Sequence, residues 1–141
     1  MQHATTITVP ATPRQVWATM SAVRDWPSWL STVDDVSPVR PEEPDGIGAR
    51  YQVRQPKLAT ATWEVTRWEP AAGFAWRSVR PGVVSVGNHT IEDLGGSSRI
   101  SLGMEWTGAL APLVNLVYGR LTQRYLETEA ASLVQRAGTA R

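Results

Sequence analysis

Apolar and polar residues alternate along much of the chain between positions 3 and 107, as they do in β-strands that bury one face. The clearest stretch is residues 98–107, where every second residue is apolar: Ile100, Leu102, Met104 and Trp106. The other strands that this pattern predicts cover residues 3–9, 32–40, 49–55, 58–69, 74–79 and 83–93. Because the last five strands follow one another through short turns, we predict an antiparallel meander.

A short helix is predicted after the first strand. Thr12 and Gln15 match a capping box, and Pro13 suits the first helical position. Apolar residues three and four positions apart would form its inward stripe: Val16, Trp17 and Met20. Asp25 is a candidate cap for a second short helix over residues 26–30.

Residues 110–137 have the periodicity of one long helix, with Gly138 as its predicted C-terminal cap. Its apolar stripe contains Leu110, Leu113, Val114, Val117, Leu121, Ala131 and Val134. A helix of about 28 residues is about 42 Å long, which is enough to cross a whole sheet. One helix does not fill the concave side of a sheet of seven strands, so bulky side chains or a ligand must fill the remaining space.

The amino-acid composition limits what can fill the space between the predicted sheet and helix. The seven tryptophans either pack the core or line an aromatic pocket. The 14 basic and 13 acidic residues nearly balance, which argues against nucleic acid as a partner. The absence of cysteine excludes disulfides, thiolate metal sites and a cysteine nucleophile. The length of 141 residues and the ordinary composition are typical of one globular domain over residues 1–141.

No segment is predicted to span a membrane. The longest apolar stretch, residues 109–118, contains Pro112 and Asn115 and is far shorter than the ~20 residues of a spanning helix. The first residues, MQHATTITVP, lack the basic and apolar regions of a signal peptide. We therefore expect a cytoplasmic protein.

Four segments carry a resemblance to a known family. The first, ITVPATPRQVWATMSAVRDWPSWLSTV, combines a strand, a proline, a capped helix with a Val-Trp pair and an Asp-Trp-Pro-x-Trp motif. WEVTRWEPAAGFAWRS and NHTIEDLGGSSRISLGMEW look like hairpins of that family, and GRLTQRYLETEAASLVQRAG looks like its final helix. In this order they resemble the START-like (SRPBCC) superfamily and, within it, the polyketide cyclase/dehydrase-like proteins.

The resemblance implies an α+β helix-grip fold, in which a curved antiparallel sheet of about seven strands wraps around a long C-terminal helix in the order β-α-α-β6-α. It also implies a deep apolar cavity between sheet and helix that binds a small hydrophobic or aromatic molecule, polyketide- or lipid-like. The superfamily includes carriers, receptors, cyclases, lipid-transfer domains and co-chaperone modules, so the fold does not select among these functions.

Strand parity and the helical stripe indicate which side chains face such a cavity. The predicted ligand-binding set is Tyr51, Val53, Trp63, Val65, Phe74, Trp76, His89, Ile91, Leu102, Met104, Trp106, Leu113, Val117 and Leu121, with Ile100 on the same face. A β-bulge would reverse the parity beyond it. Trp26 and Trp29 either form a lid or contact the ligand, or they pack at the junction of helix and sheet.

His89 is the candidate catalytic residue. A neutral imidazole can anchor a carbonyl or hydroxyl group of a ligand, or transfer a proton near neutral pH. The alternative is a histidine that bonds to a neighbouring backbone group or faces solvent. Tyr51 or Tyr118 would assist His89 as a hydrogen-bond donor.

The carboxylates of the strands are predicted to lie on the outer face of the sheet. Glu64 and Glu105 have the parity opposite to the tryptophans, so we expect them to pair with Arg67, Arg77 or Arg99. No pair of inward carboxylates is predicted, and neither glycosidase chemistry nor a carboxylate metal site is supported. We expect no metal and no cofactor.

Three functions remain. The first is a carrier or sensor of a small hydrophobic or aromatic molecule, supported by aromatic inward positions with few titratable groups. The second is an enzyme of the cyclase, aromatase or dehydratase type, in which cavity shape and proximity provide much of the catalysis. The third is a protein-interaction domain with a filled cavity. A homodimer through sheet or helix faces is left open.

Overall fold

The computed structural model describes residues 1–139. In chain order its elements are β1 (Gln2–Val9), α1 (Pro13–Met20), the 3₁₀ helix η1 (Val23–Ser28), β2 (Asp35–Pro38), β3 (Arg50–Arg54), β4 (Ala61–Glu69), β5 (Gly73–Arg80), β6 (Val83–Asp93), β7 (Ser98–Thr107) and α2 (Ala111–Thr139). This order confirms the predicted α+β arrangement of one strand, two short helices, six strands and a long helix.

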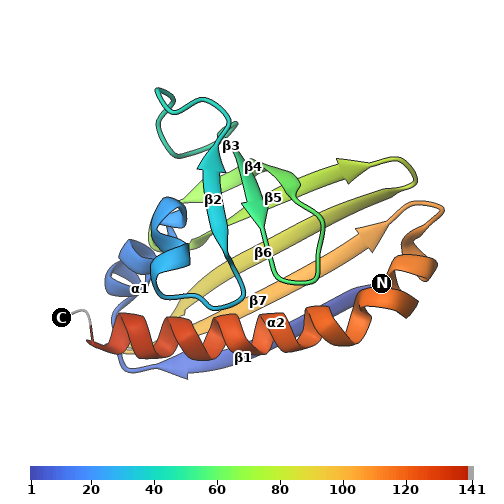
Figure 1. The fold of residues 1–141 in the computed structure, drawn as a ribbon. Coiled ribbons are helices and arrows are strands. Elements are labelled where there is room, and N and C mark those ends of the chain that lie inside the picture. Colours follow the sequence, from blue (N-terminus) through green and yellow to red (C-terminus); the bar gives the residue numbers. More distant parts are fainter. Residues whose placement is uncertain (140–141) are drawn as a thin grey trace.

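The strands of residues 1–139 form one antiparallel sheet of seven strands in the order β1-β7-β6-β5-β4-β3-β2. Hairpins join β2 to β7 in sequence, and β1 completes the sheet by pairing with β7. The sheet curves around α2, which lies across its concave side (Figure 1). The short helices lie near the C-terminal end of α2, where they close one end of the concave side (Figure 1). Within residues 1–139 no helix combines the length and the apolar character of a membrane span.

Local signals at the short helices were partly confirmed. The capping box exists: the backbone N–H of Gln15 donates to the Thr12 hydroxyl (3.3 Å), and the Gln15 side chain accepts from the backbone N–H of Thr12 (2.8 Å). The predicted cap at Asp25 is wrong, because Asp25 lies inside η1 and accepts a hydrogen bond from Ser28. The short helix therefore begins earlier than expected and takes the tighter 3₁₀ form.

The predicted bounds of the strand over residues 32–40 and of the long helix differ from the observed ones. The strand expected over residues 32–40 is confined to β2, because Thr32 and Val33 belong to the turn that follows η1. Gly138 does not terminate the long helix, which continues to Thr139. Helix ends vary by one or two residues with the criterion that defines them, so this difference is small.

A β-bulge between Val65 and Arg67 changes the parity of β4. Val65 is buried as predicted, and the bulge then turns Trp68 to the same face, where it pairs with Phe74 across the strands. The Trp68 ring contacts Phe74 at 5.6 Å and Trp17 of α1 at 4.9 Å between centroids. Simple alternation would have placed Trp68 outside.

The apolar core lies beneath the C-terminal half of α2. Leu126, Ala130 and Leu133 are buried there against the sheet and the short helices. The N-terminal half differs, because Leu116 is 81% exposed while other residues of that half cover a cavity. The C-terminal half of α2 therefore packs the core, and the cavity extends along α2 from Val114 to Glu129.

Candidate functional site

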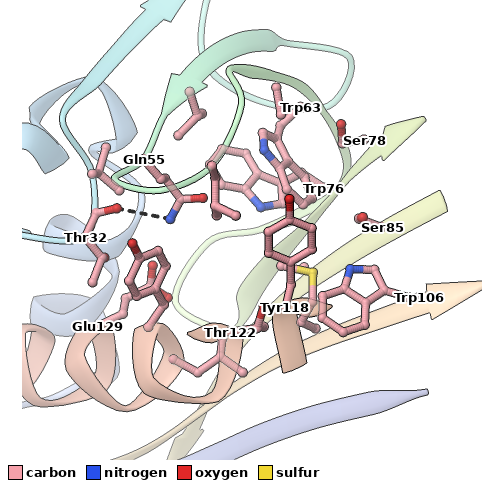
Figure 2. A pocket seen from close by; sticks show the side chains of 18 of the residues that line it. Thr32, Gln55, Trp63, Trp76, Ser78, Ser85, Trp106, Tyr118, Thr122 and Glu129 are labelled. Carbon is pink, nitrogen blue, oxygen red and sulfur yellow. Dashed lines mark hydrogen bonds between the residues drawn. The ribbon is translucent and has the colours of Figure 1, made fainter. Parts of the chain in front are cut away.

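A cavity of about 300 Å³ lies between the concave face of the sheet and α2. Four of the seven tryptophans line it: Trp26, Trp63, Trp76 and Trp106. Figure 2 shows Trp63, Trp76 and Trp106 around the space above α2. The volume is at the lower end of the range of small-molecule sites, ~300–1,000 Å³. The cavity is therefore large enough for a compact ligand, and its walls combine aromatic rings with aliphatic and polar side chains.

The two ends of the cavity differ in exposure. At the open end Ala59, Arg80 and Tyr118 are exposed, and the Arg80 guanidinium donates to the carbonyl of Thr60 (2.7 Å). At the closed end the lining residues Trp26 and Leu126 are buried. A ligand that enters past Tyr118 would place its leading group at the closed end.

The face of α2 that lines the cavity begins at Val114. It repeats every three or four residues, through Val114, Tyr118, Thr122, Tyr125, Leu126 and Glu129. The predicted placement of Leu113 and Val117 is wrong: they are 55% and 60% exposed and lie outside the lining. Each helical residue is rotated by ~100° from the one before it, so a stripe chosen one residue too early points outward. Leu121 is half-buried and also lies outside the lining.

The structure brings six predicted strand residues to the cavity: Val53, Trp63, Trp76, His89, Met104 and Trp106. The other predicted strand residues, and Ile100 with them, are buried but do not line it: Tyr51, Val65, Phe74, Ile91 and Leu102. The parity that turned them inward is correct. They lie where other side chains of the core cover the same face, so inward orientation is not equivalent to contact with the cavity.

His89 lies at the closed end with 5% of its surface exposed. Its ring stacks on Phe74 at 4.1 Å between centroids with an interplanar angle of 11°. Burial lowers the pKa of His89 to about 3, so the imidazole is neutral at neutral pH. Its Nδ1 atom is buried without a hydrogen-bond partner in the described part of the chain. The expectation that His89 faces the cavity is thereby confirmed, and its catalytic role stays a prediction.

Glu129 of α2 is the functional candidate that sequence reasoning missed. Its Oε2 atom lies 3.6 Å from Nε2 of His89, and it accepts no hydrogen bond from any residue of 1–139. Burial raises the pKa of Glu129 to about 8, so its carboxyl is mostly protonated at neutral pH. The helical spacing from Val114 through Tyr118 and Thr122 leads to Glu129, and a stripe drawn on Val114 would have found it.

Among the tyrosines, only Tyr118 of the two proposed donors reaches the cavity (Figure 2). The Tyr51 hydroxyl donates to the carboxylate of Asp45, and burial raises the pKa of Tyr51. Tyr125 also lines the cavity, with its hydroxyl donating to the carbonyl of Pro56. Tyr118 lies at the open end of the cavity and His89 at the closed end, so the assistance of a tyrosine to His89 stays a prediction.

Trp26 packs in the core and also lines the cavity. Its indole N–H donates to the carbonyl of Met20 (3.1 Å), which fixes the ring in the core. The same ring lines the cavity and lies 5.7 Å from His89 between centroids. Trp29 packs on Trp26 and lies outside the lining. The rigid wall at the closed end is therefore also part of the core.

Strand carboxylates lie mainly on the outer face. Glu64 is 3.6 Å from Arg77, as predicted. Glu105 instead accepts a hydrogen bond from Gln2 of the neighbouring strand, so its predicted arginine partner is wrong. Among residues 1–139 no cluster of three or more histidine, aspartate or glutamate side chains is placed to hold a metal ion.

Comparisons with known proteins agree with this architecture. A family model described as "Polyketide cyclase / dehydrase and lipid transport" matches residues 2–138. A search of curated protein sequences gave no match. Solved structures do match, and we describe three of them.

The Zhui aromatase/cyclase from Streptomyces sp. R1128 is 15% identical, with a TM-score of 0.79 over 97% of this chain and 93% of that chain. A START superfamily protein from Mycobacterium smegmatis is 16% identical, with a TM-score of 0.74 over 99% of both chains. Norcoclaurine synthase from Thalictrum flavum, solved with dopamine and hydroxybenzaldehyde, is 13% identical, with a TM-score of 0.75 over 96% of this chain and 84% of that chain. At these identities the likeness establishes the helix-grip fold.

Proposed function

Because the chain belongs to the polyketide cyclase/dehydrase and lipid transport family, we propose that it binds a small hydrophobic or aromatic molecule in the cavity between the sheet and α2. In this proposal the protein acts as a carrier or sensor. The observation that carries it is the cavity wall, in which, among residues 1–139, four tryptophan rings and one acidic side chain, Glu129, face the space. Aromatic walls bury a large ligand area, and the few polar groups orient the ligand.

A titration of tryptophan fluorescence tests this function. We expect saturable quenching or a spectral shift with one class in a panel of aromatic polyketides, flavonoids, fatty acids and sterols, because four emitters lie at the cavity. Trp63→Phe should remove part of the ligand-induced change. Trp29→Phe, outside the lining, should leave the change and the affinity intact. The absence of any response from the folded protein would contradict the proposal and favour an interaction domain.

A second candidate function is an enzyme that enolises a bound ketone. The observation in its favour is that a neutral imidazole and a protonated carboxyl lie 3.6 Å apart at the closed end. His89 would accept a proton from the carbon next to a ligand carbonyl while Glu129 gives its proton to the carbonyl oxygen. The products are an enol, an imidazolium and a carboxylate. Transfer of the proton from His89 to Glu129 then restores the pair.

Consumption of a poly-ketone substrate distinguishes the enzyme from the carrier. If the protein is an enzyme, His89→Ala should lower turnover by ~10²-fold or more while ligand binding persists, since acid–base catalysis typically contributes ~10²–10⁴-fold. If it is a carrier, no turnover is measured with any panel ligand that binds, and His89→Ala changes affinity alone. Product formation by the wild-type protein, followed by mass spectrometry, decides between them.

A further inference from the structure

The polar end of the cavity has unused hydrogen-bonding capacity. Glu129 accepts no hydrogen bond within residues 1–139, and its nearest basic atom is Nε2 of His89 at 3.6 Å. That distance is longer than a hydrogen bond, which spans ~2.7–3.2 Å between heavy atoms. Burying a polar group without a hydrogen-bond partner costs free energy. A ligand group that forms hydrogen bonds with both Glu129 and His89 would therefore be bound preferentially.

The distance between Nε2 of His89 and Oε2 of Glu129 suits one bridging atom. An oxygen placed ~2.8 Å from both Nε2 of His89 and Oε2 of Glu129 forms a triangle with their 3.6 Å separation as its base. A hydroxyl group has one donor and two acceptor lone pairs, so it can accept from the Glu129 carboxyl and donate to the imidazole. An ether oxygen has no hydrogen to donate to the imidazole, and an ammonium group has no lone pair to accept from the Glu129 carboxyl.

The surroundings favour an uncharged group. Burial keeps His89 neutral and Glu129 protonated at neutral pH, as their pKa values of about 3 and about 8 indicate. Arg80 is at the open end of the cavity, and Arg67 of β4, whose positive charge helps to lower the pKa of His89, lies outside the lining and pairs with Glu69 at 3.5 Å. A charged ligand group would lose its hydration without a preformed counter-charge.

We propose that the gap between His89 Nε2 and Glu129 Oε2 binds a single un-ionised hydroxyl group, and that the ligand is an aromatic or apolar skeleton that carries this hydroxyl at its leading end. The inference rests on the proposed ligand-binding function and names the chemical class of the ligand. The ring that bears the hydroxyl would lie against Trp26, Trp76 and the ring of His89, which stacks on Phe74 behind it. Glu129 is then the residue that determines specificity.

Isothermal titration calorimetry at pH 7 with three matched probes tests this site. The probes are 2-naphthol, its near-isostere 2-fluoronaphthalene, and the cationic 2-naphthylmethylamine. In Glu129→Leu the preference for naphthol over the fluoro compound should fall by about tenfold, because the hydroxyl loses a partner. Glu129→Gln should keep the preference, since the amide both donates and accepts. His89→Phe, which keeps a flat ring on Phe74, should reduce it as Glu129→Leu does.

Glu127→Gln is the control, because Glu127 is an exposed carboxylate on the same helix and should leave all three affinities unchanged. An unchanged preference for naphthol in both Glu129→Leu and His89→Phe would overturn the hydroxyl site while leaving ligand binding intact. Tighter binding of the amine than of naphthol by the wild-type protein would also overturn it. Failure of every probe to bind would overturn the cavity function and this inference together.

Discussion

Replacing Phe74 with alanine is expected to lower the free energy of unfolding by about 3–5 kcal/mol, the usual cost of deleting a buried aromatic ring. Phe74 is fully buried on β5. Its ring contacts the aromatic rings of α1, η1, β4, β5 and β6: Trp17, Trp26, Trp68, Trp76 and His89. These elements come from distant parts of the chain, so the cavity left by alanine cannot close by a small local shift.

Urea denaturation of purified variants measures this effect. A loss of this size is a large share of the ~5–15 kcal/mol that stabilises an ordinary domain. Phe74→Leu therefore provides a milder variant, with a smaller loss than alanine. Val79→Ala is the matched control, because Val79 is on the same strand and 64% exposed, and should change stability by no more than ~0.5 kcal/mol. A loss below about 1 kcal/mol for Phe74→Ala would show that the aromatic cluster is not central to the core.

The stability of the protein is expected to fall by about 2 kcal/mol between pH 6.5 and pH 8 because of Glu129, and Glu129→Gln is expected to remove this fall. The unfolded chain has an ordinary glutamate with a pKa near 4.5, whereas burial raises the pKa of Glu129 to about 8. In this window the folded state holds a proton that the unfolded state has lost. Raising the pH therefore favours unfolding, up to about pH 8.

The contribution of His89 to the pH dependence of stability has the opposite sign and acts at lower pH. Its pKa falls from 6.5 in the unfolded chain to about 3 in the folded protein, so the unfolded state binds the extra proton between these values. Stability therefore rises with pH from about 3 to 6.5. Between pH 4.5 and 6.5 the two slopes oppose each other and nearly cancel, and the Glu129 slope alone remains from pH 6.5 to 8.

Unfolding free energies measured in urea at half-unit steps from pH 6 to 8.5 test the sign and the origin of the slope. Glu129→Gln should be more stable than the wild type at pH 8 and flat across the window. Glu127→Gln should follow the wild type, since Glu127 is exposed. A wild-type profile with no fall above pH 6.5 would mean that Glu129 ionises at its usual pH, with water reaching the closed end.

Much of the architecture was predictable from local sequence. The capping box at Thr12 and Gln15 and the alternation in residues 98–107 act over a few residues, so they were recognised without knowledge of the rest. Parity also placed Trp63, Trp76 and His89 on the inner face, and all three line the cavity. Strand direction alternates with a strict period of two, which leaves little freedom in such assignments.

The candidate site was predictable only in part. Leu113 and Val117 were chosen because they are apolar, yet they are exposed. Glu129 was missed because a charged residue in a helix is normally expected on the solvated face. The bulge after Val65, which turns Trp68 inward, has no local signal that was recognised.

The sequence by itself determined the order of the elements, the antiparallel sheet, the long helix and the inner face of each strand before any bulge. The tertiary structure decided which inward residues pack the core and which line the cavity, and it alone brought Glu129 to His89. The physical reason is the distance along the chain over which each kind of interaction acts. Strand parity and helix capping depend on neighbours within one turn or one pleat, whereas the rotation of α2 about its axis depends on packing against strands and short helices that are distant in the chain.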